Sequence, residues 1–353
     1  MKETNSEESR PVLQLIFRKK DPLYFSIEKV FQTLYPSLKK RFDLEEWLLP
    51  NFSSSLRNIW SNIRSAKKNA ADLFHVTGDI HYMVLAYPRK RTILTVHDAV
   101  FLEKNKGLKK LILKWLYLKI PVARVKWVTT ISQKSRDEIV RHTGCDPDKI
   151  VVIPDPTGDF IRFREKKFDD LSPVILFIGS TPNKNLERVI KALEGIPCVL
   201  EIVGTLSSIH QGLLEKSQIN FRIFENLTEN ELADRYVNCD MVLFPSLYEG
   251  FGLPITEGQK AGRPVITSNI APMNEVAGEA ACLVNPYNVD EIRAGVRKVI
   301  EDKGYRDLLV RKGFENFLRF TPEKIAGQYI ELYEKVIHSL DSASHQEFSR
   351  RPA

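Results

Sequence analysis

The sequence predicts an α/β protein made of two doubly wound domains, each a parallel sheet with helices on both faces. Three observations predict this class. Short apolar runs, rich in β-branched and aromatic residues, alternate with amphipathic helix-like segments along the chain. The length of 353 residues suits about two domains of ~150 residues each. A stretch at 156–172 with clustered charge and no periodicity separates the two series, and we expect it to be a linker.

The first domain, 1–155, is expected to be Rossmann-like, although its pattern is less regular than that of the second. Its expected strands are the apolar runs at 13–17, 43–49, 73–78, 91–98, 127–132 and 149–154. Its expected helices are the segments at 27–38, 56–70, 106–120 and 133–144. Strands and helices that alternate in this way form a parallel sheet.

The second domain, 173–320, is also expected to be Rossmann-like. Its expected strands lie at 174–179, 198–204, 221–224, 241–246, 263–268 and 281–285. Its expected helices lie at 185–193, 210–217, 229–237, 253–261 and 290–302. A last helix is expected at 321–340, because Thr321 suits the N-cap and Pro322 the first helical position. The polar residues 341–353 are expected to form a flexible tail. Two such domains facing each other form a cleft at the carboxyl ends of their strands, where ligands bind.

The composition excludes several classes of protein. No run of about 18 apolar residues is present, so no membrane-spanning helix is expected. Met1 is followed by polar residues, so no secretory signal peptide is expected. The four cysteines form no CxxC pair, which argues against a zinc knuckle or a redox motif. We therefore expect a cytoplasmic protein with reduced thiols.

The charge is divided unevenly along the chain. Residues 1–160 hold 28 basic and 18 acidic side chains, a net charge of +10, whereas 161–353 hold 24 and 27, a net charge of −3. A basic half suggests an anionic partner such as nucleic acid, a membrane surface or a phosphorylated substrate; the alternative is a surface of solvated lysines. No recognised nucleic-acid motif accompanies the charge, so no nucleic-acid partner is expected.

The most informative stretch is FPSLYEGFGLPITEGQKAGRPVITSN at 244–269. An expected buried strand is followed by a glycine-rich turn and a helix, with Pro254 in the first helical turn and Gly262 at the end. Gly250 and Gly252 allow the backbone to approach a ligand closely because they lack a Cβ atom. A turn of this kind at a helix N-terminus favours phosphate or another anion.

Two glutamates bracket this turn, Glu249 before it and Glu257 one turn into the helix. Carboxylates do not bind an anion, but they accept hydrogen bonds from sugar hydroxyls. The N–H groups of Phe251, Gly252 and Leu253 suit phosphate. The local pattern therefore indicates a ligand with both phosphate and sugar. The alternative is a glycine turn with two solvated glutamates.

Two further strand ends carry candidate residues. One strand ends at Gly179, and Lys184 follows just before a helix that Asn185 is expected to cap. A lysine in such a loop is placed to neutralise a diphosphate, and the alternative is a surface lysine. In the first domain a strand runs into His97, which suits donation to a sugar or a phosphate; the alternative is a structural histidine.

Together these residues resemble the signature of family four of the retaining glycosyltransferases, which have the GT-B fold of two Rossmann-like domains. Glu249 and Glu257 stand with seven residues between them inside EGFGLPITE. Further segments similar to the family lie at 128–140, 149–154, 178–193, 226–252 and 262–286. The resemblance is strong over 171–300, weaker over 70–155 and slight before residue 70.

The resemblance implies a role for each matching residue. Glu249 corresponds to the glutamate that contacts the transferred sugar, and Glu257 to the one that binds the nucleotide ribose. His97 corresponds to a first-domain histidine at the reaction centre, so Glu249 and His97 are the expected catalytic residues. Lys184 is expected at the diphosphate and the main chain near Leu227 at the base. The full expected donor-binding set is Gly179, Ser180, Lys184, Leu227, Gly250, Phe251, Gly252, Leu253 and Glu257.

Two positions depart from the family pattern. Ser180 stands where many members have an arginine, so Lys184 is expected to carry more of the diphosphate contact. The first strand-to-helix loop contains no glycine, unlike that of many relatives. Its Arg18, Lys19 and Lys20 are expected to contact an acceptor diphosphate, and the alternative is a solvated charge cluster.

The resemblance implies transfer of a hexosyl group, with retention of configuration, from a nucleotide sugar, expected to be a UDP- or GDP-sugar. The expected acceptor is a saccharide or a lipid-diphosphate-linked saccharide, in the synthesis of a cell-surface polysaccharide such as lipopolysaccharide. No cofactor and no metal ion are expected, and Asp146-Pro-Asp148 is interpreted as a turn. The alternatives are an inactive sugar-nucleotide-binding protein of the same fold and a sucrose- or trehalose-type synthase.

The lysine-rich segment 106–120 is expected to be an amphipathic helix. Lys106, Lys110 and Lys114 lie in one row, and leucine, isoleucine and tryptophan lie on another face. A basic helix of this kind can lie on an anionic bilayer. We therefore expect a cytoplasmic protein that is peripheral on the inner face of the cell membrane. The alternative is that the apolar face packs on the sheet.

Overall fold

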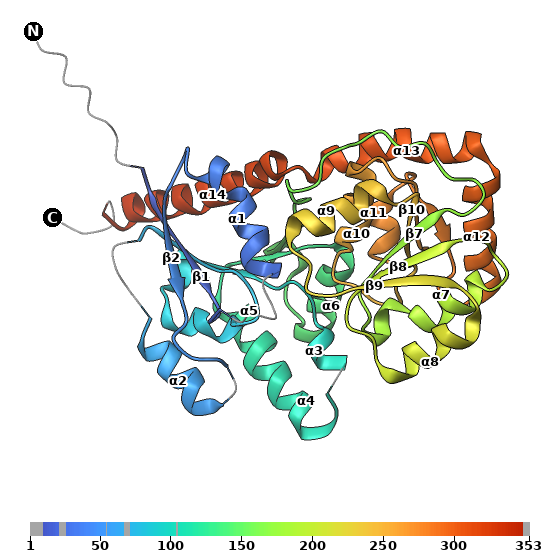
Figure 1. The fold of residues 1–353 in the computed structure, drawn as a ribbon. Helices are drawn as coiled ribbons and strands as arrows, with labels where there is room; N and C mark the ends of the chain where they lie inside the picture. Colours follow the sequence, from blue (N-terminus) through green and yellow to red (C-terminus); the bar gives the residue numbers. More distant parts are fainter. Residues whose placement is uncertain (1–9, 21–25, 54, 67–70, 104, 349–353) are drawn as a thin grey trace, which may run out of the picture. The chain divides into compact units, whose positions relative to one another are not determined.

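The computed structural model describes residues 10–20, 26–53, 55–66, 71–103 and 105–348. The chain divides into two compact units (Figure 1). Unit 1 comprises Met1–Pro154 together with Pro322–Ala353, and unit 2 comprises Asp155–Thr321. Each unit has its own parallel sheet, so the expected α/β class with two Rossmann-like domains is confirmed.

Unit 1 contains a six-stranded sheet in the order β2-β1-β3-β4-β5-β6, and every pairing is parallel. Its strands are β1 (Val12–Phe17), β2 (Asp43–Leu48), β3 (Leu73–Val76), β4 (Thr92–Thr95), β5 (Trp127–Thr130) and β6 (Ile150–Val152). Each coincides with an expected apolar run. The register places Leu15 of β1 beside Glu46 on β2 and His75 on β3.

The helices of unit 1 differ from expectation at several places. They are α1 (Ser26–Leu38), α2 (Leu56–Arg64), η1 (His81–Ala86), η2 (Arg89–Arg91), α3 (Val100–Glu103), α4 (Gly107–Leu113), η3 (Lys114–Lys119), α5 (Ile120–Arg124), α6 (Gln133–Thr143), η4 (Pro147–Lys149) and α14 (Pro322–Phe348). The helix expected at 56–70 ends at Arg64, and 67–70 lie outside the described residues. The segment 106–120 is α4 followed by the π-helical η3. The last helix continues to Phe348 instead of ending at 340.

A buried polar contact fixes α14 to the sheet of unit 1. His75 on β3 places Nδ1 2.7 Å from the Tyr333 hydroxyl of α14 and Nε2 2.7 Å from Thr95 Oγ1 of β4. Burial lowers the pKa of His75 to about 3, so the ring is neutral. Phe31 of α1 packs edge-on against the same ring, with centroids 5.1 Å apart. The helices α1 and α14 therefore cover one face of this sheet together.

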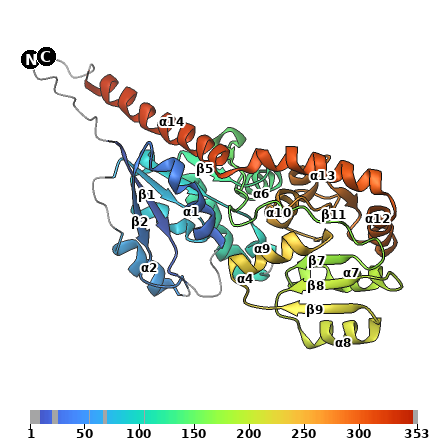
Figure 2. The same cartoon turned by 45° about the horizontal axis from the view of Figure 1, so that its top comes forward.

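Unit 2 contains a second parallel sheet, in the order β12-β11-β10-β7-β8-β9. Figure 2 shows β7, β8 and β9 side by side in this order. The strands are β7 (Val174–Ile178), β8 (Val199–Val203), β9 (Asn220–Phe224), β10 (Met241–Phe244), β11 (Val265–Ser268) and β12 (Cys282–Val284). The strand order reverses between β7 and β10, and the carboxyl ends at such a switch point are where ligands bind in doubly wound sheets.

The helices of unit 2 include two α-helices that the sequence pattern does not predict. They are η5 (Pro182–Lys184), α7 (Leu186–Leu193), α8 (Ser208–Ser217), α9 (Glu229–Asn238), α10 (Leu253–Lys260), α11 (Met273–Ala277), α12 (Val289–Glu301), α13 (Lys303–Phe317) and η6 (Leu318–Phe320). The two are the short α11 and the longer α13. The buried residues of α13 are only Arg306, Leu309 and Gly313, so α13 lacks the apolar stripe that makes a helix recognisable in a sequence.

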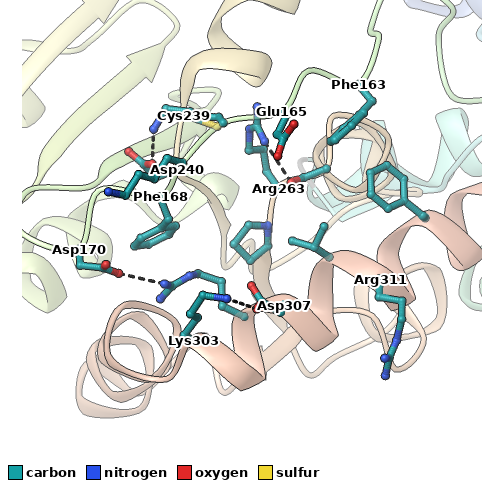
Figure 3. Close-up of a pocket in the computed structure, with 17 residues that line it drawn as sticks. Phe163, Glu165, Phe168, Asp170, Cys239, Asp240, Arg263, Lys303, Asp307 and Arg311 are labelled. Carbon is teal, nitrogen blue, oxygen red and sulfur yellow. Dashed lines mark hydrogen bonds and ion pairs between the residues drawn. The ribbon is translucent and has the colours of Figure 1, made fainter.

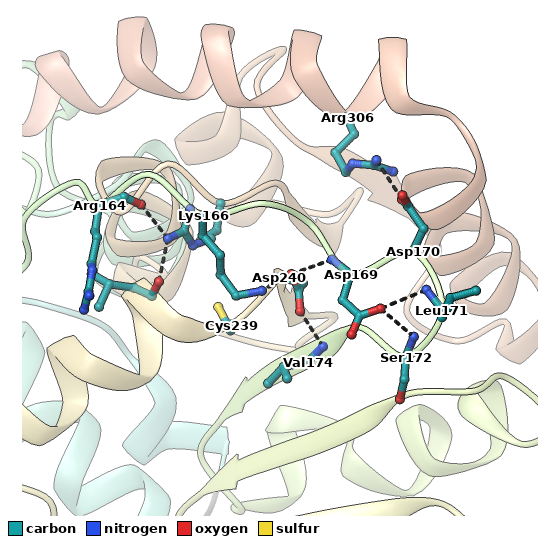
Figure 4. A network of polar contacts seen from close by, with 12 residues as sticks. Arg164, Lys166, Asp169, Asp170, Leu171, Ser172, Val174, Cys239, Asp240 and Arg306 are labelled. Carbon is teal, nitrogen blue, oxygen red and sulfur yellow. Dashed lines mark hydrogen bonds and ion pairs between the residues drawn. The ribbon is translucent and has the colours of Figure 1, made fainter.

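The stretch expected to be a linker, 156–172, packs as part of unit 2 instead. Asp240, which is buried at the amino end of β10, accepts hydrogen bonds from the backbone N–H of Asp169 at 3.1 Å and of Val174 at 2.8 Å (Figure 4). The Lys166 ammonium also pairs with Asp240. This contact satisfies a buried carboxylate, and nothing in the aperiodic segment itself indicates it.

Two sequence expectations concern membrane spans and thiols. No helix in the described part of the chain is both long and apolar enough to cross a membrane. The four cysteines carry free thiols. Burial raises the pKa of Cys198 to about 11 and that of Cys239 to about 12, so both stay protonated and are poor nucleophiles.

Candidate functional site

The candidate site lies at the carboxyl edge of the unit 2 sheet. The residues that the sequence singled out here follow the ends of β7, β9 and β10, on both sides of the switch point. Gly179 directly follows β7 with φ +92°, and a Cβ atom built there would lie 2.8 Å from Cε of Lys184. Only glycine therefore leaves room for the Lys184 side chain to fold over the strand end.

Lys184 and Glu249, which are 65 positions apart in the chain, form an ion pair. The distance from Lys184 Nζ to Glu249 Oε1 is 2.7 Å, and both side chains are largely buried. Lys184 Nζ also lies 4.7 Å from the centroid of the Phe244 ring. Asn183 adds hydrogen bonds from its amide to Glu249 Oε1 at 3.2 Å and to the Tyr248 carbonyl at 3.0 Å. The loops after β7 and β10 are thus joined around one cation and one carboxylate.

Asn185 does not cap α7 with its side chain, which corrects the sequence expectation. It lies at the N-cap position but has φ +70°, and its side chain makes no capping hydrogen bond. Its amide instead donates to the carbonyl of Pro245 at 3.0 Å and to that of Pro286 at 2.7 Å. Asn185 therefore fixes the loop after β10, which carries Glu249.

The helix α10 also begins without a side-chain cap. Its N-cap is Gly252, with φ +113°, and Pro254 lies in the first turn. By contrast, side chains cap α8, α9, α12 and α13 of the same unit. Phe251 is buried against Phe320, with ring centroids 5.4 Å apart, and this contact fixes the turn that holds Gly250. An uncapped N-terminus can offer its backbone N–H groups to an anionic ligand.

Glu257 lies on the inner side of α10 and is only 8% exposed. The Tyr236 hydroxyl of α9 donates a hydrogen bond of 2.6 Å to Glu257 Oε2. Burial raises the pKa of Glu257 to about 7, while the Tyr236 hydrogen bond and the nearby Lys184 and Lys260 act in the opposite direction. Tyr236 was not predicted from the sequence, because a tyrosine in a helix preceding a buried strand resembles any core aromatic.

The remaining predicted donor-binding residues lie at the same sheet edge. Ser180 is next to the end of β8, since a Cβ atom on Gly204, which has φ +143°, would lie 3.0 Å from Ser180 Oγ. Leu227 is half-buried in the loop between β9 and α9. The structure therefore gathers the predicted donor-binding residues along one edge of one sheet. Their contacts with a ligand stay predictions.

His97 belongs to unit 1, where it follows the carboxyl end of β4. Its Nε2 lies 2.8 Å from the carbonyl of Thr77, and Gly78 with φ +140° leaves room for the ring. A Cβ atom on Gly78 would lie 2.6 Å from Cδ2 of His97. The next residue, Asp98, accepts a hydrogen bond from the Val100 N–H at 2.9 Å, and burial raises its pKa. His97 is therefore held at a strand end, as expected.

The three basic residues after β1 have different surroundings. Arg18 pairs with Glu28 at 3.0 Å and with Asp79 at 2.7 Å, so two carboxylates balance its charge. The Lys19 ammonium lies 4.9 Å from the centroid of the Phe52 ring, and Lys20 is exposed. Arg18 and Lys19 line a cavity of about 250 Å³ at this edge of the sheet. Lys19 and Lys20 are thus more exposed than Arg18.

The structure also contains a larger cavity that no sequence motif indicates. It measures about 600 Å³ and lies at the amino edge of the unit 2 sheet, between the 163–170 segment and α13 (Figure 3). Two ion pairs lie in its walls, Arg306 with Asp170 at 2.9 Å and Lys303 with Asp307 at 2.5 Å. None of the predicted site residues lies there.

The Asp146-Pro-Asp148 sequence is a turn. It forms the start of η4, and Asp146 Oδ1 accepts a hydrogen bond from the Asp148 N–H at 3.0 Å. Within the described ranges, no group of three or more His, Cys, Asp or Glu side chains is arranged to hold a metal ion. The acidic pair is thus a local backbone feature.

Two family models match adjacent parts of the chain. The model described as glycosyl transferases group 1 matches residues 159–315, and the model described as Glycosyltransferase Family 4 matches residues 32–157. The first match covers the loops that carry Lys184, Glu249 and Glu257. The second covers the segment that carries His97.

The chain is similar to several known mannosyltransferases. It is 27% identical over 230 residues to the O-antigen chain mannosyltransferase B of Escherichia coli, which is 59% of this chain and 60% of the relative. It is 24% identical over 360 residues to the MMP alpha-(1->4)-mannosyltransferase of Mycolicibacterium hassiacum. This match covers 91% of this chain and 84% of the relative. The matched region spans 60% of the length of the E. coli O-antigen chain mannosyltransferase B and 34% of the length of the E. coli serotype-specific mannosyltransferase WbdA.

Solved structures agree in fold. A sucrose-phosphate synthase from Thermosynechococcus elongatus matches with a TM-score of 0.76 at 15% identity, covering 94% of this chain and 100% of that one. Anabaena HepE in complex with UDP and glucose matches with a TM-score of 0.70 at 14% identity, covering 91% and 99%. At these identities the likeness concerns the fold alone, which is GT-B. With the two family models covering most of the sequence, this chain belongs to the glycosyltransferases of group 1 and Family 4.

Proposed function

We propose that the protein transfers a hexosyl group from a nucleotide-diphosphate sugar to a saccharide or a lipid-diphosphate-linked saccharide, with retention of configuration. The observation that carries the proposal is the Lys184–Glu249 pair next to the uncapped start of α10. A cation and free backbone N–H donors suit a diphosphate, and a carboxylate beside them suits sugar hydroxyls. No other pattern in unit 2 combines these three features with a switch point.

The donor is proposed to be a UDP- or GDP-sugar. Anabaena HepE is described with UDP and glucose, and the relatives above are named as mannosyltransferases. Mannose and glucose are therefore the first sugars to test. Glu257 would accept hydrogen bonds from the ribose, and the main chain near Leu227 would contact the base.

The proposed reaction needs stabilisation of the leaving nucleoside diphosphate. As the bond between the sugar and the diphosphate breaks, negative charge grows on the phosphate oxygens, and Lys184 with the N–H groups of Phe251, Gly252 and Leu253 would stabilise it without rearrangement. This scheme uses no metal ion and no cofactor. The leaving phosphate would take the acceptor's proton on the same face of the sugar, while Glu249 and His97 hold the reacting groups.

The acceptor is proposed to be part of a cell-surface polysaccharide, such as lipopolysaccharide, under assembly at the inner face of the cell membrane. The E. coli relative is named as an O-antigen chain enzyme, which supports this class. Lys19 and Lys20 are the proposed contacts for an acceptor diphosphate, because Glu28 and Asp79 already neutralise Arg18. The segment 106–120 is the proposed membrane contact.

A donor screen tests the proposal. Thermal shift with UDP, GDP, ADP and their glucose and mannose conjugates should identify one nucleotide that stabilises the protein, and NMR of the product should show the anomeric configuration of the donor. Glu249→Ala should abolish transfer but keep nucleotide binding. Binding without turnover of any acceptor would favour an inactive sugar-nucleotide-binding protein, and inverted product would refute retention.

A further inference from the structure

Two helical segments of unit 1 expose large apolar side chains. On α4 and η3 these are Leu108, Leu111, Ile112 and Trp115, and on α2 with its preceding loop they are Phe52, Leu56 and Trp60. These seven residues are named the α2–α4 surface. Leu108 is 72% exposed and Trp60 is 57% exposed, and α4 buries none of its residues. The apolar face predicted for 106–120 therefore points away from the sheet, contrary to the alternative that it packs there.

The side chains of the α2–α4 surface are not the ones that pack α4 and η3 against the core of unit 1. A different set of side chains, Leu113, Leu116, Tyr117 and Leu118, packs inward from η3 and the end of α4. These residues supply the segment's contacts with the core, whereas Leu108, Leu111, Ile112 and Trp115 belong to no core cluster. An apolar area left in water in this way typically marks a binding surface.

The two parts of the α2–α4 surface are held next to each other. Tyr82 of η1 contacts both, because its hydroxyl accepts a hydrogen bond of 2.9 Å from the Asn62 amide of α2 and its ring lies 5.6 Å from the Tyr117 ring of η3. The Tyr117 hydroxyl reaches the Ser53 carbonyl at 3.4 Å. Figure 1 shows α2 and α4 projecting from the same side of unit 1. They therefore form one surface.

The two segments that carry most of this surface have charges of one sign, although Asp79, which Arg18 pairs with, lies in the cavity beside Phe52. The segments 55–66 and 105–120 contain no aspartate or glutamate, and their basic residues are Arg57, Arg64, Lys106, Lys109, Lys110, Lys114 and Lys119. Each exposed aromatic ring has a cation over it. Lys19 lies 4.9 Å from the centroid of Phe52, Arg64 lies 3.8 Å from that of Trp60, and Lys119 lies 4.5 Å from that of Trp115.

We propose that the α2–α4 surface binds an anionic lipid bilayer, with Trp60 and Trp115 at the level of the headgroups and the lysines at the lipid phosphates. Tryptophan prefers this interfacial level, and basic side chains are attracted to anionic lipid. A second copy of the chain is a poor partner, because two like-charged surfaces would repel each other. A nucleic acid would leave the leucines and isoleucine unexplained. The inference deepens the membrane contact of the proposed function by adding α2, which the sequence did not indicate.

Vesicle pelleting with the full chain tests the proposal. The protein should pellet with vesicles of equal parts phosphatidylcholine and phosphatidylglycerol, and binding should weaken with salt and be absent from phosphatidylcholine alone. Replacing Lys109, Lys110 and Lys114 by glutamine should weaken binding about a hundredfold, at about fivefold for each lysine. Trp60→Ser with Trp115→Ser should weaken it about tenfold.

Matched controls separate this surface from unspecific effects. Ile209→Ser and Lys216→Gln remove an exposed apolar residue and an exposed lysine from α8 of unit 2, and they should leave binding unchanged. All variants should keep the donor-hydrolysis rate of the parent, so that loss of vesicle binding is distinguished from failure of the donor site. Equal binding to both kinds of vesicle, or equal loss in the α8 variants, would overturn the proposal. Self-association that the Trp60 and Trp115 substitutions abolish, without vesicle binding, would assign the surface to a second copy.

Discussion

Nucleotide binding should depend on pH through Glu257. The pKa of this buried carboxyl is raised to about 7, so lowering the pH through that value protonates the group that is proposed to accept hydrogen bonds from the ribose. About nine-tenths of Glu257 is ionised one unit above its pKa and about one-tenth one unit below it. If only the ionised form accepts the ribose hydroxyls, the Kd rises about tenfold between about pH 8 and about pH 6.

Tyr236→Phe should move this transition to higher pH. The Tyr236 hydroxyl donates to Glu257 Oε2 at 2.6 Å, and this hydrogen bond holds the pKa of Glu257 below the value that burial alone would give. A hydrogen bond to a charged group is worth about 1.5–3 kcal/mol, which corresponds to a rise of about one to two pKa units when it is lost. The variant should therefore bind the nucleotide weakly at a pH where the parent binds well.

Calorimetry with a nucleoside diphosphate measures the effect, with one complication. The terminal phosphate of the ligand also titrates near pH 6, at about the second pKa of a phosphate ester. Two controls separate the groups. Glu257→Gln cannot titrate, so the pH dependence that remains in it belongs to the ligand. The ratio of the affinity for the ribonucleotide to the affinity for its 2′,3′-dideoxy analogue cancels the titration of the phosphate. This ratio should fall as the pH is lowered, and only in the parent. Identical pH profiles in the parent and Glu257→Gln would refute the reasoning.

Two further predictions test the remaining polar contacts. Lys184→Ala should weaken nucleoside diphosphate binding about tenfold to a hundredfold, because a charge-assisted contact of about 1.5–3 kcal/mol is lost. Calorimetry on the control Lys191→Ala, which replaces an exposed lysine of α7, should show no change in affinity. Equal losses of affinity in the two variants would contradict the role of Lys184. Tyr333→Phe removes the hydroxyl that lies 2.7 Å from the buried His75 and should lower the free energy of unfolding by about 1–3 kcal/mol in urea titrations. Tyr287→Phe, at an exposed position, should leave the free energy of unfolding unchanged. If Tyr333→Phe has the same free energy of unfolding as the parent, the contact with His75 does not stabilise the fold.

The twelve strands of the described residues could be predicted from the sequence because most are short apolar runs between polar helices, although β2 and β9 are largely exposed edge strands. The edge on which Lys184, Glu249 and Glu257 meet could also be predicted, since parallel strands bring their carboxyl ends to one side of a sheet. The direct contact between Lys184 and Glu249 could not, because spacing within one segment says nothing about a pair 65 positions apart. The loops that carry these residues are thus recognisable in the sequence, whereas the ion pair that joins the two loops is not.

The assignment of α14 to unit 1 shows the same limit at longer range. His75 and Tyr333 are 258 positions apart, and neither differs in the sequence from an ordinary core residue. The segment 156–172 differs from the expected linker for a related reason. Its charges resemble those of a solvated linker, but long-range contacts order it, among them those with the buried Asp240 at the amino end of β10 and with Arg306 of α13. Long-range satisfaction of buried polar groups decides both cases.

Tyr236 has the most direct consequence for function among the residues that the sequence did not indicate. The motif supplies Glu257, but the environment of Glu257 is set from α9, outside the motif. A carboxylate buried to this degree without a donor would be neutral at physiological pH and a poor acceptor for ribose hydroxyls. The Tyr236 hydroxyl and the nearby Lys184 and Lys260 counteract burial and bring the pKa to about 7. The pH range in which Glu257 is ionised therefore depends on a helix that contributes no residue to the recognisable signature.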